Sequence, residues 1–184
     1  MKKSLFALAP LALLLLVANN ASAASNAQIT ITGSVVATSC DINLSTTSLD
    51  LGNVAQADFA STRQPIASSQ RDFALTLSNC GTPEASQVAQ VQVTGSTLSG
   101  ENNIFNSDTT RNTGVMLTDA TNSSGFIDNN AVLTIATADA SAPQASDFNG
   151  QRLSLRAGLA STATDANVDL GGVTAPILFN FITN

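Results

Sequence analysis

Two cysteines, Cys40 and Cys80, are the side chains of this chain best suited to covalent or metal chemistry. A thiol pair can form a disulfide, bind a metal ion or supply a nucleophile. The long spacing is not a CxxC motif, and the chain has no histidine to complete a metal site. In an oxidising compartment such a pair favours one disulfide, with a reactive or metal-binding pair as the alternative.

Catalytic chemistry lacks its usual side chains. The chain has no histidine, tyrosine or tryptophan, and its only lysines are Lys2 and Lys3. Serine and threonine hydroxyls therefore have no evident activating base, and no pair of acids is singled out by its spacing. The sequence predicts neither an enzyme nor a cofactor site.

Acidic residues in loops are the remaining candidates for ion binding. Asp108, Asp119 and Asp128 carry oxygen ligands of the kind that calcium prefers, but they lack the regular spacing of an EF-hand loop. Solvated turn residues are the better account of these carboxylates. We therefore expect no metal site.

Residues 1–23 have the features of a secretory signal peptide. Lys2 and Lys3 precede an apolar run over 5–17, and residues 21–23 form a small-x-small cleavage site. The run is shorter than the ~20 residues that span a bilayer, which disfavours the alternative of a membrane anchor. Cleavage leaves an exported chain that begins at Ala24.

The exported chain is acidic. The precursor has a formal net charge of −6, and removal of both lysines makes the charge more negative. Nucleic acids and anionic lipids are bound through basic surfaces. Nucleic acid is therefore not an expected partner.

Short apolar alternations with a period of two residues predict an all-β fold. Turn residues separate them, and such a period gives each strand one buried face, so two sheets must pack face to face. The expected strands lie near 29–36, 49–51, 73–77, 91–93, 115–117, 132–135, 153–159 and 177–181. Residues 53–70 and 98–113 are expected to be loops with at most a short helical turn.

The two ends of the exported chain carry matching patterns. Residues 24–32 have apolar side chains on one parity only, at Ala27, Ile29 and Ile31. This segment could be the first edge strand of its own sandwich, or a strand given to another molecule. Near the carboxyl end, residues 177–181 form a strongly apolar alternation whose strand needs neighbours on both sides.

Taken in order, several segments resemble the pilin subunits of chaperone–usher fimbriae of the type 1 kind. They are the signal peptide, ITITGSVVATSCDI (29–42), FALTLSNC (73–80) and APILFNF (175–181). The resemblance implies an incomplete immunoglobulin-like β-sandwich, the pilin fold, which is completed by a donated strand. It also implies export through the periplasm, a periplasmic chaperone that lends a strand, and an outer-membrane usher where another pilin subunit replaces it.

The resemblance assigns roles to individual residues. It makes residues 24–34 a donor-strand extension and residues 35–184 the pilin domain, and it pairs Cys40 with Cys80. The donor positions it implies are Ala27, Ile29, Ile31 and Gly33. The groove edge and chaperone contact it implies are Ile177, Phe179 and Phe181. The tyrosine that the family carries near its carboxyl terminus is absent here.

The expected function is a structural subunit of a cell-surface fimbria, which polymerises by donor-strand exchange and contributes to adhesion through the whole organelle. The alternative is a minor tip subunit or a self-complemented secreted module that binds a carbohydrate or receptor. Sugar sites generally use aromatic platforms, and phenylalanine is the only aromatic residue present.

Overall fold

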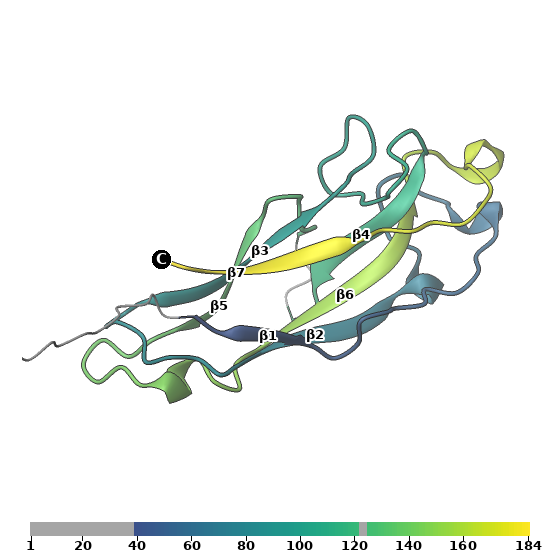
Figure 1. The fold of residues 1–184 in the computed structure, drawn as a ribbon. Helices are drawn as coiled ribbons and strands as arrows, with labels where there is room; N and C mark the ends of the chain where they lie inside the picture. Colours follow the sequence, from purple (N-terminus) through teal and green to yellow (C-terminus); the bar gives the residue numbers. More distant parts are fainter. Residues whose placement is uncertain (1–38, 122–124) are drawn as a thin grey trace, which may run out of the picture. The chain divides into compact units, whose positions relative to one another are not determined.

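Strands and short turns of 3-10 helix make up the structure, a computed structural model that describes residues 39–121 and 125–184. Its strands are β1 (Asp41–Leu44), β2 (Arg71–Ser78), β3 (Val88–Gly95), β4 (Thr113–Asp119), β5 (Val132–Thr137), β6 (Arg152–Ser161) and β7 (Ile177–Thr183). Its 3-10 turns are η1 (Gln56–Asp58), η2 (Ala67–Ser69), η3 (Ala145–Asp147) and η4 (Asp165–Asn167). The prediction of an all-β fold is confirmed (Figure 1).

Two antiparallel sheets form a sandwich. The first sheet has the strand order β1-β2-β6-β4, and the second has the order β5-β3-β7 (Figure 1). All of the described residues belong to one compact unit. Within it β1 and β7 are both edge strands, one in each sheet, and this placement is what creates the candidate site.

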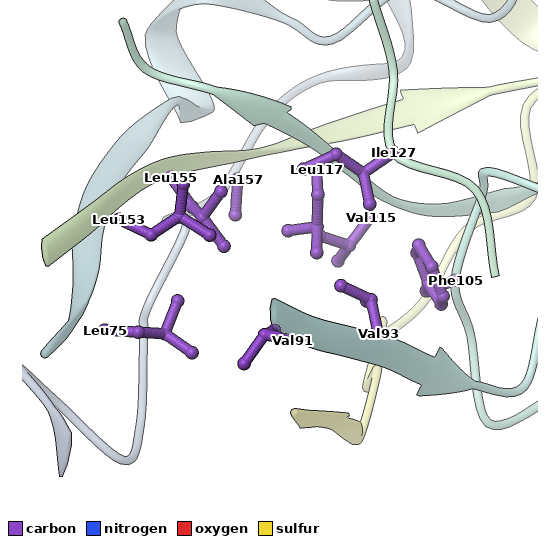
Figure 2. Packing of buried hydrophobic residues seen from close by; sticks show 10 residues of the cluster. All are labelled: Leu75, Val91, Val93, Phe105, Val115, Leu117, Ile127, Leu153, Leu155 and Ala157. Atoms are coloured by element: carbon purple, nitrogen blue, oxygen red, sulfur yellow. The ribbon is translucent and has the colours of Figure 1, made fainter. Parts of the chain in front are cut away.

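The core lies between the sheets and follows the alternation of the strands. On β3, Val91 and Val93 point inward and are fully buried, while Gln90 and Gln92, which alternate with them, point to the other face. Facing them across the core are inner side chains of the first sheet, among them Leu155 and Leu117 (Figure 2). A period-2 pattern places every second side chain on the same face, so the sequence predicts which residues of a strand with one wet face point to the core.

Strand β4 is buried on both faces. Val115 and Leu117 enter the main core, whereas Met116 packs with Leu98 and Ile104 in a separate buried cluster. Residues 98–106 therefore cover the outer face of β4. At Gly114 the cover is so close that a β-carbon would lie 2.6 Å from a side-chain carbon of Ile104.

Replacing Gly114 by alanine is therefore expected to destabilise the domain. The added methyl group would also lie 2.7 Å from the carbonyl oxygen of Phe105, so the backbone of the covering segment must shift. Overpacking of this kind costs about 1–3 kcal/mol, which guanidinium unfolding measures directly. The matched control is Gly81→Ala, where nothing lies within 4 Å. Equal unfolding midpoints for the two variants would contradict the prediction.

The prediction of a strand at Leu49 and Leu51 is wrong. Both side chains pack against the main core as the alternation predicts, but their backbone forms no ladder, and the pairing strand is β1 at Asp41–Leu44. Alternation sets the side on which a residue points, whereas a strand also needs a neighbour with which to pair. The loops expected at 53–70 and 98–113 are confirmed, with η1 and η2 as the short helical turns in the first.

None of the helical turns in residues 39–121 and 125–184 has the length and apolar character that crossing a membrane requires.

Candidate functional site: an open groove beside the last strand

The last strand, β7, has one edge with no partner strand among the described residues. It pairs with β3 along its whole length, and the pairing continues where Val88 and Asn184 exchange backbone hydrogen bonds of 3.1 and 3.2 Å. Antiparallel pairs alternate between hydrogen-bonded and non-hydrogen-bonded, so every second residue of β7 turns its N–H and C=O away from β3. These are Ile177, Phe179, Phe181 and Thr183, whose backbone groups face the open edge.

A groove of about 620 Å³ lies beside this edge. Residues 44–54, which begin at the end of β1, line one side, and residues 168–176 with the start of β7 line the other. Between them lie inner side chains of the first sheet, namely Phe73, Val115, Leu117, Ala157 and Leu159. The groove is therefore a gap between the edge strands of the two sheets, with an apolar floor and walls that also carry polar residues.

Phe179 is the clearest sign that this part of the core is incomplete. Its ring centroid lies 6.0 Å from that of Phe73, with the planes tilted by 58°, so the pair joins β7 to β2 across the groove. Both rings are only half-buried, although they point inward, whereas Val91 and Val93 of β3 are 0% exposed. The difference arises because, among the described strands, β3 has a neighbour on each side and β7 has a neighbour on one side.

Of the residues expected at the groove edge, Ile177 and Phe179 line the groove. Phe181 lies on the same face of β7 but packs against a second buried cluster that contains Leu77, Cys80 and Phe148. The inner face of β7 thus meets the open groove at its start and a closed part of the core at its end.

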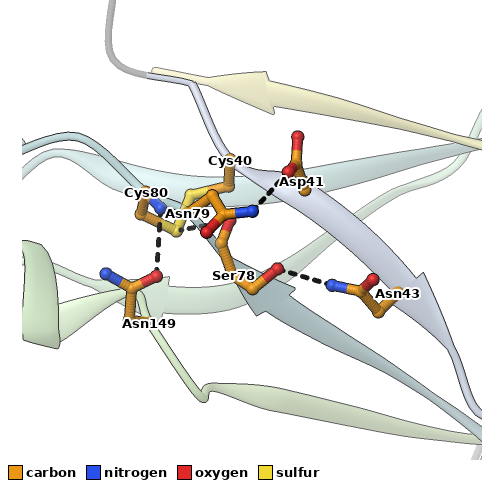
Figure 3. The surroundings of a disulfide bond; sticks show 7 residues. All are labelled: Cys40, Asp41, Asn43, Ser78, Asn79, Cys80 and Asn149. Atoms are coloured by element: carbon orange, nitrogen blue, oxygen red, sulfur yellow. Dashed lines mark hydrogen bonds between the residues drawn. A yellow bond between two sulfur atoms is a disulfide. The ribbon is translucent and has the colours of Figure 1, made fainter.

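Cys40 and Cys80 form a disulfide at this closed end, with their Cα atoms 4.2 Å apart (Figure 3). The backbone N–H of Cys80 also donates to the side-chain oxygen of Asn149 at 3.0 Å. The expected pairing is confirmed, and it excludes the alternative of a free or metal-binding thiol pair. The bond joins the residue before β1 to the chain just beyond β2.

Removing this disulfide is expected to lower the free energy of unfolding by about 4 kcal/mol, because it closes a loop of 40 residues in the unfolded chain. The measurement is guanidinium unfolding of a variant with both Cys40→Ser and Cys80→Ser, which avoids an unpaired thiol. The reference is the oxidised wild type, with its bond verified by mass spectrometry. A loss below about 1 kcal/mol would show that the unfolded chain is not constrained in this way.

At the other end of the groove, Leu170 is held in solvent. Its side chain is 75% exposed although it lines the groove. Its backbone is fixed: Arg111 donates to the carbonyl oxygen of Leu170 at 2.6 Å, and Asn112 and Asp169 exchange two hydrogen bonds of 2.8 Å. This loop is therefore a defined part of the groove mouth, and the sequence pattern did not reveal it.

Two of the three acids considered as calcium ligands, Asp108 and Asp119, have structural partners. Asp108 accepts hydrogen bonds from the Thr110 hydroxyl and from the Thr110 backbone N–H. Both bonds, the hydroxyl bond most, lower the pKa of the Asp108 carboxyl below its ordinary value. Asp119 accepts the equivalent pair of bonds from Thr121. Asp108 lies in a loop, as expected, whereas Asp119 is the last residue of β4. Within residues 39–121 and 125–184, no three potential metal ligands of the His, Cys, Asp or Glu type cluster together.

Several expectations concern residues outside the described part of the chain. They are the signal peptide at 1–23, the extension at 24–34, and its donor positions Ala27, Ile29, Ile31 and Gly33. The first strand expected at 29–36 lies outside it too.

The groove floor was not identified from the sequence, although part of the signal was present. Phe73, Val115 and Leu159 lie on the inward parity of strands that the alternation did predict. The sequence did not show which of these inward positions lie beside the open edge of β7. That depends on the strand order, which joins segments far apart in the sequence.

Comparison with known proteins places the chain in a family. A family model described as fimbrial protein matches residues 29–182. The fold is similar to the P pilus rod subunit PapA, with 16% identity, a TM-score of 0.53, and coverage of 84% of this chain and 97% of that chain. It is also similar to a chain in a chaperone–usher pilus structure concerned with rod uncoiling, with 14% identity, a TM-score of 0.50, and coverage of 88% and 97%.

These structural likenesses establish the pilin type of immunoglobulin-like sandwich. No curated protein sequence gives a significant match. The family model, however, spans most of the chain. The resemblance to fimbrial subunits is therefore confirmed, and the chain belongs to the fimbrial protein family.

Proposed function

We propose that this fimbrial protein is a structural subunit of a chaperone–usher pilus on the cell surface, and that it polymerises by donor-strand exchange. The observation that carries the proposal is the groove between the edge strands β1 and β7, whose floor is made of apolar inner side chains. A groove of this kind takes an extended strand, whose backbone bonds to the open edge while alternate side chains enter the core.

The occupant we propose is the extension of the next subunit, residues 24–34. Ala27, Ile29 and Ile31 would enter the groove, with Gly33 at the passage to the donor's own domain. Burying one isoleucine side chain contributes about 1.5–3 kcal/mol, and the backbone bonds add to this. Because the donated strand becomes part of the core, the joint between subunits should dissociate very slowly.

An open groove also needs a temporary occupant before assembly. Exposed apolar surface and an unpaired edge strand make a lone subunit prone to aggregate. We propose that a periplasmic chaperone lends a strand to the groove, in contact with Ile177, Phe179 and Phe181. Exchange for the extension of the next subunit then takes place at an outer-membrane usher, and fibres emerge outside the cell.

Binding of a synthetic peptide of residues 24–34 to the mature chain tests the groove. Phe179→Ala should weaken binding by about ten- to a hundredfold, because the peptide's apolar side chains lose a partner worth about 1.5–3 kcal/mol. The control is Leu178→Ala, the neighbouring residue of β7, whose side chain is 60% exposed on the opposite face. A peptide that binds both variants alike does not occupy the groove, and the proposed function fails.

A further inference from the structure

We infer that the Cys40–Cys80 disulfide carries fibre tension past the first sheet and directly into β3 of the second sheet. The inference rests on the proposed function, in which a neighbouring subunit holds residues 24–34. Tension then reaches each domain through the chain that leads to Cys40. The strand that comes next, β1, is poorly suited to resist it.

β1 is the weakest attachment in the first sheet. It spans four residues, and among the described strands its one partner is β2. Two side-chain hydrogen bonds beside the disulfide also join β1 to the end of β2. Asn43 donates to Ser78 at 2.6 Å and Asn79 donates to Asp41 at 2.8 Å, and both bonds are exposed to solvent (Figure 3). A short edge strand pulled from its end separates one pair at a time, and each backbone bond resists with only about 0.5–1.5 kcal/mol.

The disulfide lies where it can bypass this weak strand. Cys40 directly precedes β1, and Cys80 follows the end of β2 by two residues. A covalent bond at these positions spans β1, the groove wall that follows it and all of β2. Tension that arrives at Cys40 crosses to Cys80 and continues along residues 81–87 to Val88, where β3 begins.

β3 is built to take that tension. It is the central strand of the second sheet, with β5 on one side and β7 on the other. Its inner side chains Ala89, Val91 and Val93 are all 0% exposed. Its ladder with β7 extends from Ala89–Thr183 to Gly95–Ile177, so a displaced β3 must break many backbone bonds and uncover the core.

The path ends at the next joint of the fibre. β7 passes the tension from β3 to the strand held at its open edge, which in the proposed function belongs to the neighbouring subunit. The whole route therefore runs from extension to disulfide, β3, β7 and donated strand. β1 and the adjoining groove wall carry no tension, so the groove keeps its shape while the fibre is stretched.

Single-molecule stretching of assembled fibres tests the route with Asn43→Pro in β1. Ser45 donates to the carbonyl oxygen of Ala74 at 2.9 Å, so by antiparallel alternation Asn43 stands in a hydrogen-bonded pair with Thr76. Proline there removes the N–H and weakens β1. In disulfide-bonded fibres we expect a lower guanidinium midpoint for the subunit but an unchanged force at which subunits yield.

The comparison is the same substitution without the disulfide, either in Cys40→Ser with Cys80→Ser or after reduction of preassembled fibres with dithiothreitol. Without the disulfide, the force at which subunits yield should fall, and Asn43→Pro should lower it further. Each yielding event should also lengthen the fibre by roughly 13 nm more than in bonded fibres, because residues 41–79 can then extend. An equal fall of the force with Asn43→Pro in bonded and reduced fibres would overturn the route. Failure of the proposed function is read separately, from fibres that still assemble when residues 24–34 are deleted.

Discussion

A subunit that carries a second copy of residues 24–34 behind Asn184, on a long flexible linker, is expected to unfold at a much higher guanidinium concentration than the mature chain alone. In the proposed function, the copy supplies a partner for the edge of β7 that has none among the described strands. Two buried isoleucines and a new backbone ladder should add about 5 kcal/mol or more, which moves the midpoint by about 1 M or more.

The linked copy is a sharp test because a matched control differs only in the core-facing side chains. Replacing Ile29 and Ile31 of the copy by aspartate keeps the length and the backbone, but it would bury two charges against the apolar floor of the groove. This control fusion should unfold at the midpoint of the mature chain. If the mature chain and both fusions share one high midpoint, the sandwich is already closed, and the self-complemented binding module becomes the better interpretation.

Subunits with Ile31→Asp are expected to form no fibres of normal length, although they still fold and accept a donor strand. Residue 31 is proposed to enter the core of the neighbouring subunit, where an aspartate carboxylate has no partner and its desolvation costs several kcal/mol. Mixed with wild-type subunits, the variant should accept a wild-type strand but donate none, so mean fibre length should fall as its share rises. Electron microscopy measures that length.

The control for this experiment is Thr30→Asp, which adds the same charge one residue earlier. A strand places adjacent side chains on opposite faces, so residue 30 should point away from the groove and tolerate the charge. Fibres of normal length from Ile31→Asp would refute strand donation by this segment. Loss of fibres with both variants would show that the charge, not its position on the strand, prevents assembly.

The cysteine pair shows how far residue types alone can lead. Two cysteines without histidine or a CxxC spacing left a disulfide as the favoured interpretation, and the structure contains that bond. The sequence did not reveal that the bond flanks β1 and β2, because β1 itself carries a weak pattern. Ile42 is its half-buried residue, and its other side chains are exposed.

The C-terminal strand likewise shows what the sequence pattern predicted and what it did not. The alternation of Ile177, Phe179 and Phe181 predicted both the strand and its inner face. It did not distinguish Phe179, which faces Phe73 across the groove, from Phe181, which is packed against the disulfide cluster. Their sequence environments are alike, but Phe179 faces Phe73, whereas Phe181 packs against the cluster that contains Leu77, Cys80 and Phe148.

By itself, the sequence determined the all-β class, the inward parity of most strands, the disulfide and the acidic, histidine-free character that disfavours catalysis. These follow from residue type and from a two-residue period, which are properties of the local chain. Only the tertiary structure decided that β1 and β7 are edge strands on either side of an open groove, that Leu170 stands at its mouth, and that Gly114 admits no side chain. Those features arise from contacts between segments far apart in the chain, and no local pattern encodes which segments will meet.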